Sequence, residues 1–301
     1  MKLSLRLSPP AGNRGWRSIY PVCGFQTCSS TLLMRSLPGR AGVKVGQQWY
    51  CSVDCFALAS RSQLSALSGG NVLDMRRTPR LSIGLVLLSK GHLTDGQLRS
   101  AMAESQRHGE SLEATLVRLG LATERTIVAA RAAQWGCPVL AQDREAQHVE
   151  SDIPPTLLQC CSAVPLHYSF TARRILLGFV YRVEHSLLNA LDLVSDLRAE
   201  PCFIAPSEFK EQTRRVMAAP NYEEVVFEET QTLTQMARNV GGFAAEIAVR
   251  EARFARCRDY IWTRLTGRKG KIDLLFRVES ATQAGKKAIS PILQKNIRSV
   301  G

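Results

Sequence analysis

The sequence predicts a mixed α+β chain built from several small domains. Three observations lead to this prediction: a helical pattern written twice between residues 83 and 134, two pairs of cysteines near the N-terminus, and short alternating apolar segments after residue 163. With 301 residues and 45% apolar content, the chain is long enough to form two or three compact domains.

The repeated pattern has a constant offset of 29 residues. In each copy a glycine follows an apolar helix and can take the positive φ that ends it, and a threonine then stands where an N-cap belongs. The aligned pairs are Ile83 with Leu112, Gly91 with Gly120, Thr94 with Thr123, and Leu98 with Ile127. Two such units predict a paired helical subdomain that buries one apolar face against the other. The alternative is an ordinary helical hairpin with a chance likeness between its halves.

Four cysteines near the N-terminus have a spacing typical of a zinc site. Four residues separate Cys23 from Cys28, and three separate Cys51 from Cys55. Four thiolates satisfy tetrahedral Zn²⁺, and so short a segment needs this support because its own apolar core is small. The alternative is a set of buried free cysteines.

The second cysteine pair opens a helix that we expect over about residues 52–67. This arrangement is similar to the treble-clef class of zinc fingers, in which the last two ligands sit at the start of a helix. The spacing between Cys23 and Cys28 departs from the zinc knuckle, which usually has two residues between its ligands. The loop between the pairs carries Arg35, Arg40 and Lys44, so nucleic acid and protein are both candidate partners, and protein binding is favoured.

The net charge of +13 is concentrated at the two ends of the chain. Residues 1–80 carry a net charge of +9, residues 81–263 of −3, and residues 264–301 of +7. Basic ends favour an acidic partner, nucleic acid or an anionic membrane surface; the alternative is that they serve only solubility. No run of eighteen apolar residues is present, so we expect no membrane span. Nine cysteines without a secretory signal predict a cytoplasmic protein with reduced thiols.

A small three-stranded α/β unit is predicted after the repeat. A short helix should end at Cys160, and strands should follow at 163–168, 175–181 and 201–205, with helices at 185–197 and 207–217. We expect Cys160, Cys161 and Cys202 to be core residues. Beyond this unit, an apolar stripe predicts a long helix from Leu233 to Phe254 with close packing or a bend at Gly241 and Gly242, followed by a hairpin formed by 260–265 and 272–278.

The segment IGLVLLSKGHLTDGQLRSAM, residues 83–102, resembles the LG-x-x-L-V-x-x-G-L-I-x-x-x-x-L-x-x-x-L motif of a known domain. This is the N-terminal domain of the type II secretion and type IV pilus assembly ATPases, the GspE N-terminal domain. AAQWGCPVL, residues 132–140, is similar to its usual continuation, and residues 153–207 resemble its α/β half. The resemblance covers about residues 80–217.

Some members of that family bind cyclic di-GMP across the tandem motif, through an arginine at its start and a glutamine at its end. On this chain the matching ligand-binding positions would be Gly84, Gly91, Gly120 and Gln134. The departures are Ser82 and Ser111 in the arginine positions, Ser105 in the first glutamine position and Glu113 in place of the second glycine. Loss of both guanidinium groups removes bidentate phosphate contacts, so a cyclic di-GMP sensor is the alternative reading and not the first.

The family's ATPase motor requires a G-x-x-x-x-G-K-[ST] loop, and the sequence contains none. We therefore predict no enzyme activity, and a non-catalytic adaptor or regulator with a zinc-binding N-terminus whose protein partner is a secretion or pilus component. A nucleic-acid-binding zinc-finger protein is a further alternative. The predicted order is a flexible basic N-terminus (1–20), a zinc finger (21–67), a linker (68–79), the tandem helical repeat (80–140), a small α/β subdomain (141–218), a helix with a β-hairpin (219–280) and a basic tail (281–301).

Overall fold

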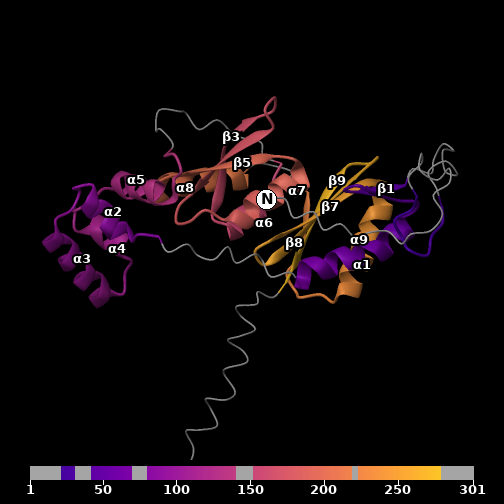
Figure 1. Ribbon diagram of the computed structural model, residues 1–301, viewed down its shortest axis with the longest axis horizontal. Coiled ribbons are helices and arrows are strands. Elements are labelled where there is room, and N and C mark those ends of the chain that lie inside the picture. Colours follow the sequence, from indigo (N-terminus) through magenta and orange to yellow (C-terminus); the bar gives the residue numbers. More distant parts are fainter. Residues whose placement is uncertain (1–21, 31–41, 70–79, 140–151, 219–222, 279–301) are drawn as a thin grey trace, which may run out of the picture.

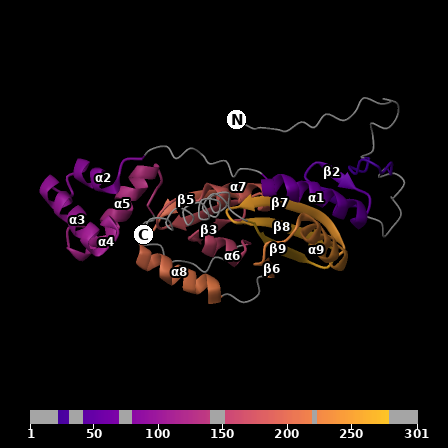
Figure 2. The same ribbon diagram turned by 90° about the horizontal axis from the view of Figure 1, so that it is seen from below.

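The computed structural model describes residues 22–30, 42–69, 80–139, 152–218 and 223–278. The predicted N-terminus 1–20 and tail 281–301 lie outside these ranges, as do Arg35, Arg40 and most of the linker 68–79. The fold is mixed α+β, as predicted, and it contains two mixed sheets. Its parts lie in a row, from a helical subdomain through a three-stranded α/β unit to a six-stranded sheet (Figures 1 and 2). Within the described residues, no helix is long and apolar enough to cross a membrane.

The helical subdomain consists of α2 (Ile83–Ser89), α3 (Asp95–His108), α4 (Leu112–Arg118) and α5 (Glu124–Trp135). The two copies have matching ends: Ser82 and Ser111 cap α2 and α4, and Thr94 and Thr123 cap α3 and α5. Gly91 and Gly120 have φ of 72° and 67°, as expected for residues that end a helix. The predicted duplication is therefore present in the backbone as well as in the sequence.

The core of this subdomain is also duplicated. Helix α2 packs on α5, and α4 packs on α3. In both pairs, the first helix of one copy packs on the second helix of the other copy. Equivalent positions are buried in both copies, namely Leu87 and Leu116, Leu98 and Ile127, and Ala101 and Ala130. Each copy thus covers the apolar face of the other, as the repeat predicts.

The α/β unit contains α6 (Pro155–Cys160), β3 (Ala163–Ser169), β4 (Arg174–Phe179), α7 (His185–Ser195), β5 (Arg198–Phe203) and α8 (Pro206–Ala218). Its sheet has the order β3-β4-β5, with β4 antiparallel to β3 and parallel to β5. All its predicted elements are present, although β5 begins three residues before the predicted strand. Arg131 of α5 joins this unit to the helical subdomain, because its guanidinium donates to the carbonyl of Val180 and pairs with Glu113 at 3.1 Å.

The six-stranded sheet combines segments from both ends of the chain. It has the order β2-β1-β7-β8-β9-β6. Its strands are β1 (Val43–Val45), β2 (Gln48–Tyr50), β6 (Glu224–Phe227), β7 (Val249–Cys257), β8 (Tyr260–Gly267) and β9 (Lys271–Arg277). The hairpin β8–β9 is the predicted one. Strand β1 pairs in parallel with β7, so the segment that carries the cysteine pairs continues the C-terminal sheet.

Each face of this sheet is covered by different elements. On one face, α1 (Val53–Gly69) and α9 (Leu233–Glu246) lie against each other and contact Ile261 of β8. On the other face, Trp262 of β8 belongs to the core of the α/β unit. The predicted close packing at Gly241 is present, because a Cβ there would lie 3.0 Å from Cβ of Ala57 in α1.

A buried ion pair also connects the sheet to the α/β unit. Arg264 of β8 pairs with Asp273 of β9 at 2.9 Å and with Asp152 at 2.7 Å. The indole of Trp262 donates to the same Asp273 carboxylate at 2.7 Å, and the side chain of Asp273 is fully buried. A buried carboxylate is tolerated here because several donors surround it.

The predicted long helix from Leu233 to Phe254 is wrong in its second half. Helix α9 ends at Glu246, Ala248 has a φ of 50°, and Val249 begins β7. Strand β7 is buried on both faces, and its pairing with β8 shifts register between Val249 and Glu251. The sequence of such a strand does not alternate simply, so its apolar residues fell into the spacing of a helix. Strand β6 was not predicted either.

Candidate metal centre

The first cysteine pair lies on a turn held against the end of β2. The amide of Gly24 donates to the carbonyl of Trp49 at 2.8 Å, and the amide of Cys23 donates to the carbonyl of Ser30 at 2.9 Å. The amide of Cys28 donates to the carbonyl of Phe25 at 2.9 Å, which closes the turn. Both thiols of this pair are therefore positioned by backbone hydrogen bonds.

The second pair lies where β2 gives way to helix α1. Cys51 follows the last residue of β2, and Cys55 is the third residue of α1. The hydroxyl oxygen of Ser52 accepts a hydrogen bond from the amide of Cys55 at 3.2 Å, in the manner of an N-cap. The cysteines thus lie on either side of a capped helix start, as the sequence predicts.

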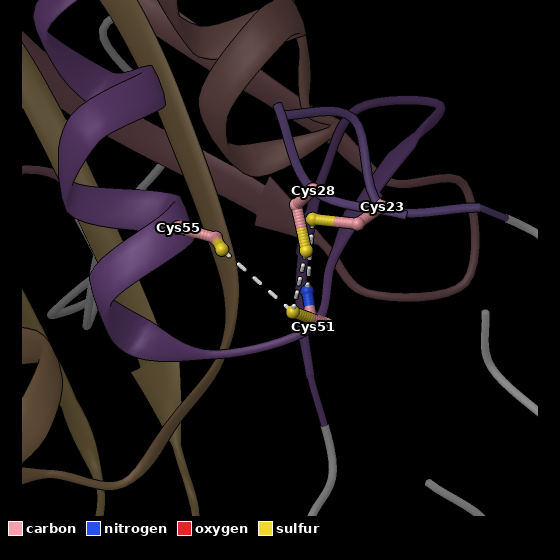
Figure 3. Close-up of side chains that lie close together, drawn as sticks. All are labelled: Cys23, Cys28, Cys51 and Cys55. Atoms are coloured by element: carbon pink, nitrogen blue, oxygen red, sulfur yellow. Dashed lines mark hydrogen bonds between the residues drawn. The ribbon is translucent and has the colours of Figure 1, made fainter. Parts of the chain in front are cut away.

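The four sulfur atoms form one cluster, with all Sγ atoms within 4.8 Å of one another. Dashed lines in Figure 3 join the Sγ of Cys51 to two of the others, at 3.5 Å from that of Cys28 and 3.7 Å from that of Cys55. Zinc–sulfur bonds of about 2.3 Å in a tetrahedron place sulfur atoms about 3.8 Å apart. The spacing and the donor set therefore fit a tetrahedral zinc ion.

The surroundings of the cluster differ from thiol to thiol. Hydrogen bonding with the side chain and backbone of Ser30 lowers the pKa of the Cys28 thiol to about 6. Burial raises the pKa of Cys23, and it raises that of Cys55 to about 12. Some of these thiols therefore ionise only with difficulty in the absence of a cation, and a divalent metal ion would offset that cost.

The cluster also belongs to the core of the six-stranded sheet. Cys23 and Cys51 are buried together with Val43 of β1 and Phe56 of α1. Gly42, which precedes β1, lies so close to Tyr50 and Trp49 that an added Cβ would clash with both. The position of the cysteines therefore depends on the same contacts that hold β1 in the sheet.

In the structure, the residues at the predicted ligand-binding positions of the helical repeat mainly make contacts within the helical subdomain. Gly84 is buried in α2, where a Cβ would lie 2.7 Å from Leu98 and 3.2 Å from Leu112. Gly91 and Gly120 end helices, and the side-chain amide of Gln134 donates a hydrogen bond to the backbone carbonyl of Leu81.

Two further groups of residues lie outside the predicted sites, although Arg80, two residues before the arginine position of the first copy, is a candidate to replace that arginine after a local shift. Arg80 stacks on the ring of Trp135 at 3.4 Å, next to Gln134. A second group of thiols comprises Cys160, Cys161 and Cys257. The neighbouring cysteines 160 and 161 were expected to be core residues, and the only sequence signal for a cluster was their adjacency.

No protein-family model matches the chain, and no curated protein matches it. Among solved structures, the chain is similar to MshE, solved with cdg, at 22% identity and a TM-score of 0.38, over 46% of this chain and 99% of the other. It is also similar to the N-terminal domain of XpsE at 25% identity and a TM-score of 0.33, over 44% of this chain and 92% of the other. Both matches cover a little under half of this chain and most of the other one.

Proposed function

We propose that this chain is a non-catalytic binding module whose N-terminal segment is held in place by one structural zinc ion. Cys23, Cys28, Cys51 and Cys55 would supply the four ligands. The observation that supports this most strongly is the approach of all four Sγ atoms to within 4.8 Å of one another. Four thiolates complete the tetrahedron and leave no position for a substrate, which is the pattern of a structural site.

The zinc ion would join two parts of the chain that are weakly connected without it. Strands β1 and β2 have three residues each, which is short for an independent hairpin. Bound zinc would fix the turn at Cys23 and Cys28 to the start of α1, in a treble-clef-like arrangement. It would thereby stabilise β1 in its pairing with β7.

An adaptor or regulatory role fits this organisation better than catalysis does. The sequence has no phosphate-binding G-x-x-x-x-G-K-[ST] loop, and a closed zinc site supplies no reactive water. We propose a protein as the partner, with a secretion or pilus component as the first candidate, because residues 80–217 resemble the N-terminal domain of those ATPases. A cytoplasmic location would follow from this role.

Metal analysis of the purified full-length chain tests the proposal. We expect one zinc ion per chain, and loss of that zinc when Cys51 and Cys55 are both replaced by serine. The matched control is Cys137→Ser, which removes a half-buried thiol outside the cluster. A folded N-terminal segment without bound metal would contradict the proposal.

The cyclic di-GMP sensor is the rival function, and local contacts of the repeat disfavour it. Ser82 and Ser111, in the arginine positions, cap helices, and the carboxylate of Glu113 stands where the first copy has Gly84. Isothermal titration with cyclic di-GMP distinguishes the two functions. We expect no saturable heat at micromolar concentrations, and saturable binding that is lost in Gln134→Ala would favour the sensor.

A further inference from the structure

Three thiols from two distant parts of the sequence meet where the α/β unit contacts the six-stranded sheet. Cys160 ends α6, Cys161 follows it, and Cys257 ends β7. The Sγ of Cys161 lies 3.6 Å from that of Cys160 and 3.5 Å from that of Cys257. The three sulfur atoms therefore form one group, in which Cys160 also interacts with Cys257.

The three thiols differ in their access to solvent. Cys257 is 0% exposed and Cys161 is 4% exposed, whereas Cys160 is only partly buried. A reagent in solution reaches Cys160 first, and the two inner thiols are shielded from direct attack. Any oxidation of the inner pair must then pass through Cys160 or through an opening of the fold.

The electrostatic surroundings of the three thiols also favour the entry of oxidation at Cys160. Hydrogen bonds from the thiols of Cys161 and Cys257, together with the guanidinium charge of Arg258, lower the pKa of the Cys160 thiol. Hydrogen bonding to Cys160 and burial raise the pKa of Cys161. Cys160 therefore ionises more readily than the two buried thiols, and the thiolate is the form of cysteine that attacks a disulfide.

We propose that Cys160, Cys161 and Cys257 form a thiol relay that carries oxidation by a small-molecule disulfide from the surface to the buried Cys161–Cys257 pair. Cys160 attacks the disulfide RSSR, forms a mixed disulfide and releases one thiolate RS⁻. Cys161 then gives its proton to the released RS⁻ and attacks the Cys160 sulfur, which releases the second RS⁻. Finally Cys257 gives its proton to this second RS⁻ and attacks the Cys161 sulfur, which returns Cys160 to its thiolate form.

The net reaction converts two protein thiols and one RSSR into one protein disulfide and two RSH, so electrons and atoms balance. Each transfer is between sulfur atoms that are 3.5 or 3.6 Å apart in the reduced protein. The product links α6 to β7 and thus fastens the α/β unit to the six-stranded sheet. A cross-link between residues so far apart in sequence restricts the unfolded chain strongly.

The relay is tested by treating the reduced, zinc-loaded full-length chain with oxidised glutathione. Remaining thiols are alkylated at timed intervals, and disulfide-linked peptides are identified by mass spectrometry. We expect a Cys161–Cys257 disulfide as the main product within residues 152–278, and formation at least ten-fold slower in Cys160→Ser. We expect Cys257→Ala to stop at a glutathione adduct on Cys160 or at a Cys160–Cys161 disulfide.

Cys202→Ala is the matched control, because it removes a buried thiol outside the relay. Its rate of Cys161–Cys257 disulfide formation should equal that of the unmodified chain, and circular dichroism should show that all variants fold alike. Absence of the Cys161–Cys257 disulfide in the unmodified chain would overturn the proposal. Equal rates in the Cys160→Ser variant and the unmodified chain would overturn it as well.

Discussion

The two cysteine clusters of this protein use the same side chain in different surroundings. In the N-terminal cluster, four sulfur atoms surround a common centre, and backbone turns direct each of them toward it. In the second cluster, three sulfur atoms form a smaller group, with the partly buried Cys160 outside and the buried Cys161 and Cys257 inside. Four thiols around one centre suit a metal ion, whereas three thiols with one outer member suit transfer of oxidation from outside to inside. Geometry rather than composition thus separates the two expected chemistries.

The largest effect should come from breaking the closed cluster. Cys51→Ser removes the thiol that lies next to both Cys28 and Cys55. We expect zinc content to fall from one ion per chain to almost none, with a loss of several kcal/mol in the free energy of unfolding, because metal binding contributes to folding. Metal analysis and thermal unfolding measure the two quantities, and a drop in melting temperature of about 10 °C is expected.

Cys257→Ser is the corresponding change in the second cluster. It should leave the zinc content at one ion per chain. If it released zinc, the separation of the two clusters would be wrong.

A difference of at least about 100-fold should separate the alkylation rates of Cys160 and Cys202 at pH 7. Cys160 has its pKa lowered to about 4 by hydrogen bonds from neighbouring thiols, and burial raises that of Cys202 to about 12. Because the thiolate is the nucleophile, Cys160 should react at a rate that is constant above about pH 5 and falls below pH 4, whereas Cys202 should stay unreactive up to pH 11.

Iodoacetamide labelling of the folded chain, followed by peptide mass spectrometry, measures both rates across this pH range. Limited access to the Cys160 sulfur slows its reaction at every pH and therefore leaves the midpoint of the pH profile at the pKa of the thiol. A midpoint near the ordinary cysteine pKa would show that the second cluster holds no thiolate.

Ser30→Ala should weaken zinc binding by about ten-fold, the usual scale for a residue that supports a ligand. Hydrogen bonding with Ser30 favours the ionised form of Cys28, and the change removes the side-chain part of it. Competition with a zinc-binding dye measures the affinity. The matched change in the other cluster is Ser186→Ala, which removes the hydroxyl 3.9 Å from the Cys257 sulfur and should leave zinc affinity unchanged.

The smallest effect is expected for Cys161→Ala. Removing one buried sulfur atom should lower the free energy of unfolding by about 1 kcal/mol, the scale of one lost methylene and a small cavity. Urea unfolding with unchanged zinc content would agree with a thiol that packs when reduced and is not a ligand. A loss larger than about 3 kcal/mol would indicate that the reduced cluster has a structural role beyond packing.

The helical repeat and the closed cluster could be predicted because their signals are local. Ser82, Thr94 and Gly91 act within one turn of chain, and their counterparts 29 residues later repeat the same contacts. The cysteine pairs are likewise recognisable from the spacing of their residues. The turn before Ser30 and the start of α1 are then enough to bring the four sulfur atoms together.

What the sequence did not predict depends on contacts between distant segments. Strand β7 was taken for helix because pairing with β8 and burial of both faces override its local pattern. The parallel pairing of β1 with β7 has no local signal at all. For the same reason the second cluster was missed, since Cys257 is 96 residues from Cys161 and only the contact between the end of β7 and the residue after α6 brings the two together.

The central claim is that the N-terminal cysteines bind one structural zinc ion, and X-ray absorption at the zinc edge of the purified chain tests it most directly. We predict a single shell of four sulfur atoms at about 2.3 Å and no nitrogen or oxygen ligand. A protein that carries no zinc while Cys23, Cys28, Cys51 and Cys55 remain in place, or a zinc shell that contains water or imidazole, would contradict it.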